Sequence, residues 1–188
     1  THRKDDVLFE KIITSDHAPA PLREDRAALW NAVEAAENRG DARVAYEIKL
    51  ALPHELSQAQ NTELASAYAA MLMQRHGQAV DLTIHKADTH GDTRNIHAHL
   101  MLSPRALEAD GFAKKKLRAI TDKVQGPKEI EAWRQGWQDL ANKALERAGH
   151  TARIDMRSYK RQGIEREEAM RGDLAVRPEL RGRPPVRG

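Results

Sequence analysis

Apolar and polar residues alternate along three stretches of this chain, and each stretch predicts a β-strand. The alternation occupies residues 44–50, 80–85 and 96–102. Side chains two apart on a strand share a face, so each strand should have one buried and one open face. A fourth hydrophobic stretch, residues 5–14 (DDVLFEKIIT), predicts a strand near the start of the chain.

Other stretches have the hydrophobic spacing of helices. Leu29, Trp30 and Val33 share one side of the first, and Ser57 with Gln60 has the spacing of a capping box before the second. The expected helices are residues 22–39 ending at Gly40, 58–76 ending at Gly77, and 127–149, in which Ile130, Trp133, Trp137, Leu140 and Ala144 lie on one side.

Strands followed by long helices indicate an α+β fold, an antiparallel sheet with long helices packed on its apolar face. The remaining patterns are weaker. They predict a basic loop with partial helix at 107–127, a short strand at 151–156, a short helix at 157–172 and an irregular stretch at 177–188. We expect one domain over residues 1–170 and a basic, irregular tail over 171–188.

Composition narrows the classes of protein. At 188 residues the chain is long enough for one domain, and no apolar run is long enough to span a membrane. Cysteine is absent, which excludes disulfides and thiolate metal sites. Because the sequence begins with Thr1 and shows no signal peptide, we expect it to be an interior or processed piece of a longer, cytoplasmic protein.

The net charge of +3 is unevenly distributed. Residues 153–188 carry ten Lys and Arg against six Asp and Glu, and residues 113–128 carry six basic residues against Asp122 alone. Basic clusters on a near-neutral body favour a polyanionic partner such as nucleic acid. Solvated lysines and a frayed tail would produce the same counts, so composition leaves both interpretations open.

Three histidines carry the candidate chemistry. His85 ends one predicted strand and His97 and His99 begin the next, so an antiparallel pairing with 85 opposite 97 brings all three to the polar face. Three imidazoles with open positions is the arrangement of a catalytic metal site, and Glu47, on the polar face of another strand, could support them. Imidazole suits zinc, nickel, copper, iron or manganese, so residue type leaves the ion open. We expect His17, His54, His76, His90 and His150 to be ordinary surface histidines.

The motif VDLTIHKA…NIHAHLMLSPR resembles the three-histidine core of the MobA/MobL family of plasmid mobilisation relaxases, in the His-hydrophobic-His endonuclease superfamily. The resemblance continues in the same order through LWNAVEAAENR, YEIKLALPHELS, DGFAKKK and WRQGWQDLANKALERAGHTARIDMRSYKRQGIERE, and covers residues 3–168. It implies an enzyme that nicks one DNA strand at a transfer origin through a 5′-phosphotyrosyl intermediate, with Mg²⁺ or Mn²⁺ as the ion.

The resemblance also implies roles for individual residues. His85, His97 and His99 match the ion ligands, and Glu47 and Asp6 match supporting acidic positions. Where the family often has His, this chain has Met156, to which we assign no ligand role.

The tyrosine nucleophile of the family lies in an N-terminal segment that we expect to be outside this chain. The three tyrosines present are poor candidates, because Tyr46 should face the apolar side of its strand and Tyr68 the inward side of its helix. Tyr159 matches a family position without a nucleophilic role.

The expected partners are single-stranded DNA of a transfer origin, accessory mobilisation proteins and a type IV secretion coupling protein. We expect the DNA to contact basic side chains on and beyond the histidine strand, namely Arg94, Arg105, Lys114, Lys115, Lys116 and Arg118. Two other functions remain open: a nuclease of rolling-circle replication or transposition from the same superfamily, and a non-enzymatic module that only binds single-stranded DNA.

Overall fold

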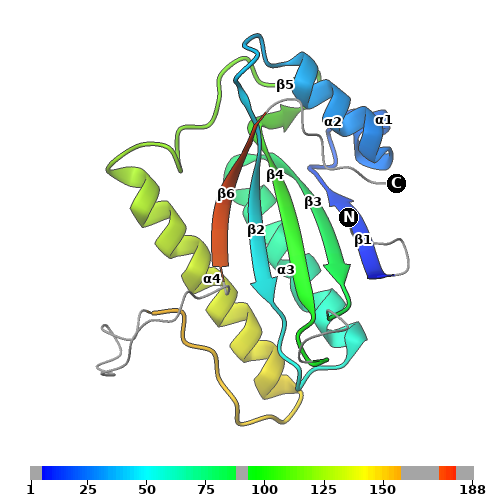
Figure 1. Ribbon diagram of the computed structural model, residues 1–188, viewed down its shortest axis with the longest axis vertical. Helices are drawn as coiled ribbons and strands as arrows, with labels where there is room; N and C mark the ends of the chain where they lie inside the picture. Colours follow the sequence, from blue (N-terminus) through cyan, green and yellow to red (C-terminus); the bar gives the residue numbers. More distant parts are fainter. Residues whose placement is uncertain (1–5, 88–92, 158–173, 181–188) are drawn as a thin grey trace.

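An antiparallel sheet forms the centre of the molecule (Figure 1). The computed structural model describes residues 6–87, 93–157 and 174–180. The elements in chain order are β1 Val7–Ile13, α1 Ala20–Glu24, α2 Arg26–Ala35, β2 Arg43–Ala51, α3 Gln58–His76, β3 Gln78–His85, β4 His97–Glu108, β5 Gly111–Phe112, α4 Gln125–Arg147 and β6 Leu174–Leu180. The strand order is β1-β3-β4-β2-β6, with β5 paired to β4 alone, and every pairing is antiparallel. The expected α+β class is therefore confirmed.

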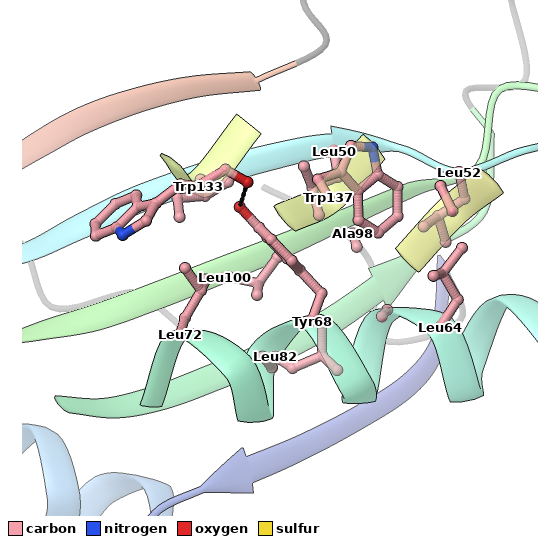
Figure 2. Close-up of a cluster of buried hydrophobic side chains, with 14 of the residues drawn as sticks. Leu50, Leu52, Leu64, Tyr68, Leu72, Leu82, Ala98, Leu100, Trp133 and Trp137 are labelled. Atoms are coloured by element: carbon pink, nitrogen blue, oxygen red, sulfur yellow. Dashed lines mark hydrogen bonds between the residues drawn. The ribbon is translucent and has the colours of Figure 1, made fainter. Parts of the chain in front are cut away.

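The two faces of the sheet are covered differently. One face packs against α3 and α4 and forms the main hydrophobic core, in which Tyr68 and Trp137 meet edge to face at 5.3 Å between ring centroids. Figure 2 shows the Tyr68 hydroxyl directed at the Trp133 carbonyl, to which it donates a hydrogen bond of 3.0 Å. The other face carries a smaller apolar cluster that includes Trp30 of α2, so α2 covers only part of it.

Several sequence predictions are confirmed. The strand expected at 5–14 is β1. The apolar positions of the alternating stretches face the main core, and Leu29, Trp30 and Val33 of α2 are buried. Val44 is an exception, because it packs in the smaller cluster beside an irregularity of β2 between Arg43 and Ala45. Helix α3 has the expected capping box of Ser57 and Gln60, and it ends at Gly77, whose φ of 72° is left-handed. The sequence predicts these helix ends correctly because the capping box and the glycine each act within one or two turns of the end that they form.

Other boundaries differ from the prediction. The helix expected at 22–39 is two helices, because the Asp25 side chain accepts hydrogen bonds from the backbone N–H groups of Ala27 and Ala28 and so begins α2 afresh. Helix α2 then ends at Ala35, before Gly40. The loop expected from residue 107 begins later, because β4 continues to Glu108 and the chain turns at Ala109 and Asp110 into β5, where Gly111 has a φ of 120°. Residues 113–124 then form no helix or strand, and α4 begins at Gln125.

The chain after α4 also departs from the prediction. Residues 151–156 form no strand, since side chains of α4 bind their backbone: Asn142 pairs with both polar groups of Ile154, and Gln138 accepts from the Met156 N–H. The irregular tail expected over 171–188 is wrong for residues 174–180, which pair with the edge of β2 as β6. The helix expected at 157–172 lies almost wholly outside the described residues. In the described part of the chain, no helix is both long and apolar enough to cross a membrane.

Candidate functional site

The three histidines lie on the face of the sheet opposite the main core. His85 of β3 pairs with His97 of β4, the register that the sequence predicts, and Thr83 pairs with His99 one row further along. Strand β2 continues both rows, with Ala51 opposite His97 and Lys49 opposite His99. Residues opposite one another in an antiparallel pair share a face, so the histidines project together from two adjacent strands.

Two of the histidine rings and one carboxylate are in contact. The rings of His85 and His99 meet edge to face, with 5.1 Å between their centroids. Glu47 Oε1 lies 2.9 Å from His99 Nδ1, and the two side chains are 23% and 18% exposed. An ionised carboxylate can only accept a hydrogen bond, so Nδ1 of His99 must carry a proton and its N–H donates the hydrogen bond to Glu47. In neutral His99 this leaves the lone pair on Nε2, which can then bind a metal or accept a proton.

The donor set suits a divalent ion, although the ligands are not gathered around one point. Among the residues that the structure describes, no three His, Asp or Glu side chains converge closely enough to hold a metal ion. The chemistry of His85, His97 and His99 nevertheless fits, because three imidazoles can ligate one ion and a carboxylate already orients one of them.

The backbone of Asp6 is bonded to the residue that follows His85. Its carbonyl accepts a hydrogen bond of 2.8 Å from the Lys86 N–H, which holds the start of β1 next to the end of β3. The next residue, Val7, pairs with His85. The structure therefore brings Asp6 and Glu47 to opposite sides of the histidines.

A buried ion pair borders the histidine group where α2 begins to cover the sheet. The Asp81 side chain has no exposed surface and accepts bidentate hydrogen bonds of 2.7–2.9 Å from Arg26 of α2 and one of 3.0 Å from Trp30 Nε1. Burial alone lowers the pKa of Arg26, but hydrogen bonds to Asp81 and the charges of Asp81 and Glu10 raise it overall. This network fixes α2 on the sheet and thus sets the limit of the open polar face.

Lys49 is a site residue to which sequence reasoning gave no role. It is opposite His99 in the β2–β4 ladder and partly exposed, next to Glu47 along the same face. The alternation at residues 44–50 already assigned Lys49 to the polar face, and that signal could have identified it.

The basic residues expected to bind DNA fall into two groups in the structure, exposed residues and residues paired with a carboxylate. Arg94 is exposed just before the histidine strand, and Lys114, Lys115 and Arg118 are exposed in the loop after β5. Arg105 is only 12% exposed; it forms an ion pair of 2.8 Å with Glu37 and donates to the carbonyls of Ala113 and Lys114.

Arg105 is therefore a structural residue of this loop. It lies six residues beyond His99 on β4, roughly 20 Å along the strand. Lys116 also pairs with Glu37, at 2.7 Å.

His76 and two of the tyrosines are partly or fully buried, away from the histidine group. His76, expected to be an ordinary surface residue, is partly buried and bonded to Glu129 at 2.8 Å. Tyr46 and Tyr68 are buried, as expected, and burial raises the pKa of Tyr68. Tyr159 and His90 lie outside the described residues.

Comparisons with known proteins agree with the resemblance seen in the sequence. The model of the MobA/MobL family matches residues 2–175. The mobilization protein MobL of Acidithiobacillus ferridurans is 35% identical over 88% of this chain and 49% of its own length. Mobilization protein A of Escherichia coli is 37% identical over 86% of this chain and 23% of its own length.

A solved structure also has this fold. A chain from a structure described as "Molecular Basis of Vancomycin Resistance Transfer in Staphylococcus aureus" aligns with a TM-score of 0.69 and 33% identity, over 80% of this chain and 76% of that one. The chain thus spans about half the length of the MobL relative, or less for Mobilization protein A, and most of the solved one.

Proposed function

Because this chain belongs to the MobA/MobL family, we propose that it is the metal-binding body of a relaxase that nicks one strand of DNA at a plasmid transfer origin. The observation that carries the proposal is the open polar face, where His85, His97 and His99 share two adjacent strands and Glu47 is bonded to one of them. An open sheet face suits an extended strand of nucleic acid better than a small molecule, which binds in an enclosed pocket.

His85, His97 and His99 would hold one divalent ion, with Glu47 keeping the Nε2 lone pair of His99 directed at it. Such an ion supplies Lewis-acid polarisation of the scissile phosphate. Imidazole donors favour Mn²⁺ or a later first-row ion over Mg²⁺, which prefers oxygen ligands. Lys49, opposite His99, is suited to contact a phosphate oxygen on the same face.

The covalent step requires a tyrosine hydroxyl. The phenolic oxygen bonds to phosphorus, and the bond between phosphorus and the 3′ oxygen breaks. The phenol loses its proton and the 3′ oxygen gains one. The products are a 5′-phosphotyrosyl protein and a 3′-hydroxyl. Tyr46 and Tyr68 are buried and unsuited to this attack. Tyr159 matches a family position without a nucleophilic role, so we propose that the nucleophile comes from a segment outside these 188 residues.

The same proposal implies a cellular setting. The substrate would be single-stranded DNA of the transfer origin, met in the cytoplasm. Accessory mobilisation proteins and the coupling protein of a type IV secretion system would be the protein partners.

Titration with Mn²⁺ tests the site directly, by the loss of the electron paramagnetic resonance signal of the free ion. The 188-residue chain should bind one Mn²⁺, His99→Ala should abolish tight binding, and Glu47→Gln should weaken it about 10- to 100-fold. His17→Ala is the matched control, since His17 is exposed and follows the end of β1 that is far from His85. Equal losses in His17→Ala and His99→Ala, or no saturable binding, would contradict the metal site.

Nicking by the full-length protein separates a relaxase from a binding module. With labelled single-stranded DNA carrying the transfer origin, the unaltered protein should give a protein-linked product and the His99→Ala variant should not. If the unaltered protein and the His99→Ala variant both bind the DNA and neither cleaves it, the proposed activity is wrong.

A further inference from the structure

A recess of about 380 Å³ lies at the end of the sheet that is away from the histidines. It is formed where the segment after α2, the start of β2, the end of β4 and the loop after β5 meet, near the top of Figure 1. Its walls are Glu37, Asn38, Arg39, Asp41, Ala42, Arg43, Arg105 and Lys116. Four cations against two carboxylates give these walls a net charge of +2.

A buried carboxylate organises two of the four cations. Glu37 is 3% exposed and binds Arg105 through Oε1 at 2.8 Å and Lys116 through Oε2 at 2.7 Å. Burial by itself raises the pKa of Glu37, but the hydrogen bonds from Arg105 and Lys116 outweigh burial and lower it. Glu37 therefore stays ionised at neutral pH and anchors the basic loop as one wall of the recess.

A third cation has an unused donor. The Nε atom of Arg43 is buried, and among the described residues no atom accepts a hydrogen bond from it. The same guanidinium lies 5.1 Å from the centre of the Tyr46 ring and reaches the Tyr46 hydroxyl at 3.4 Å through Nη1. Buried donors are nearly always satisfied in native proteins, so an acceptor entering the recess would complete the bonding of Arg43.

We propose that the recess binds one backbone phosphate of the single-stranded DNA substrate. A phosphodiester presents the paired anionic oxygens that an arginine fork recognises, and phosphate contacts fix the register of a strand. Arg43 is six residues from Lys49 on β2, and Lys49 is opposite His99, so the recess is about 20 Å from the histidines along the strand. At the stacked spacing of 3.4 Å this is roughly six nucleotides, and fewer for a stretched strand.

This inference rests on the proposed function, since it assigns a second contact to the same substrate. It goes further in two respects. The protein should require a minimum length of DNA, and its affinity should be sensitive to the charge of one linkage distant from the nick. Base identity at that linkage should have little effect, because only the phosphate is bound.

The test measures binding of transfer-origin DNA by fluorescence anisotropy over a series of salt concentrations. Arg43→Gln should weaken binding about tenfold and reduce the salt slope by about one contact. Arg23→Gln removes the same charge from an exposed position of α1 and should have little effect. Equal affinities and slopes for the two variants would overturn the proposal.

A second measurement uses the unaltered protein, so that it does not depend on the folding of a variant. Neutral methylphosphonate linkages are introduced one at a time along the DNA. One linkage away from the nick should weaken binding about tenfold in the unaltered protein and have no further effect in Arg43→Gln. A scan with no sensitive linkage beyond the histidine site would overturn the proposal.

Free phosphate is the other source of the same chemistry. The melting temperature is therefore measured with and without orthophosphate at constant ionic strength. If orthophosphate raises the melting temperature of the unaltered protein but not that of Arg43→Gln, and the DNA scan shows no sensitive linkage, the recess binds the small anion. That result would overturn the DNA assignment. If the unaltered chain binds no single-stranded DNA at all, the proposed function itself fails, which is a different result from the loss of the Arg43 effect alone.

Discussion

Replacing Glu129 should weaken the contact between α3 and α4 and should destabilise the fold in a pH-dependent way. Glu129 lies in the second turn of α4 and accepts two hydrogen bonds of 2.8 Å from Arg75 at the end of α3. His76 Nε2 and Trp133 Nε1 each lie 2.8 Å from Oε1 as well. The bonds from Arg75 are the main cause, and with the other two they lower the pKa of Glu129 from 4.5 to about 2 against the opposing effect of burial.

The size of the effect follows from this difference in pKa. A shift from 4.5 to about 2 corresponds to at most ~3.4 kcal/mol at 1.36 kcal/mol for each pKa unit. The Glu129 side chain is 13% exposed but that of Arg75 is 37% exposed, so solvent screens the pair and we expect about 1–2 kcal/mol. Because the folded pKa is depressed, this stabilisation is present above pH 4.5 and is lost as the pH falls towards 2.

Urea unfolding at a series of pH values provides the assay. Glu129→Gln keeps the size of the side chain and removes its charge, so it should unfold at a lower urea concentration than the unaltered chain at pH 7 and at the same concentration near pH 2. Glu63→Gln, at an exposed position of α3, is the control and should match the unaltered chain at neutral pH. A loss in Glu129→Gln that is equal at both ends of the pH range would refute the assignment of the pKa shift to this contact.

Three further predictions concern the site. Asp81→Asn should leave Arg26 buried without a full counter-charge and lower the free energy of unfolding by about 3 kcal/mol, measured in urea at pH 7; a loss below ~1 kcal/mol would show that the network is not structural. Lys49→Gln should weaken binding of single-stranded DNA about tenfold by anisotropy while Mn²⁺ binding is unchanged, and parallel losses of both would point to a disturbed sheet instead. The 188-residue chain with Mn²⁺ and transfer-origin DNA should form no covalent adduct, whereas a fusion to the upstream segment should form one; an adduct mapped to Tyr159 would show that the nucleophile lies within this sequence.

The arrangement of the histidines could be predicted because it depends only on parity and on a short connection. His85, His97 and His99 have odd numbers on two strands joined by a single loop, so one register decides their common face. The structure has this register, with His85 opposite His97. The bond between Glu47 and His99 required more, because the sequence does not state that β2 pairs with β4.

The partners of the buried charges could not be predicted in the same way. Arg26 is 55 residues from Asp81 and Arg105 is 68 residues from Glu37, and no local pattern links either pair. In the sequence, Arg105 and Lys116 look like free cations beside a basic loop. The carboxylate that binds them belongs to the segment that follows α2, and only the folded chain brings it to them.

The positions of these carboxylates change which cations are available to DNA. A cation held by a buried carboxylate loses much of its freedom to follow a phosphate, because moving it would leave the buried charge without its partner. Of the basic cluster at 114–118, Lys116 is committed in this way and the other three residues are exposed. Affinity for DNA should therefore depend less on the total number of basic residues than on Lys49 and Arg43, whose positions on β2 are fixed by the sheet and whose separation sets the length of strand that the protein can bind.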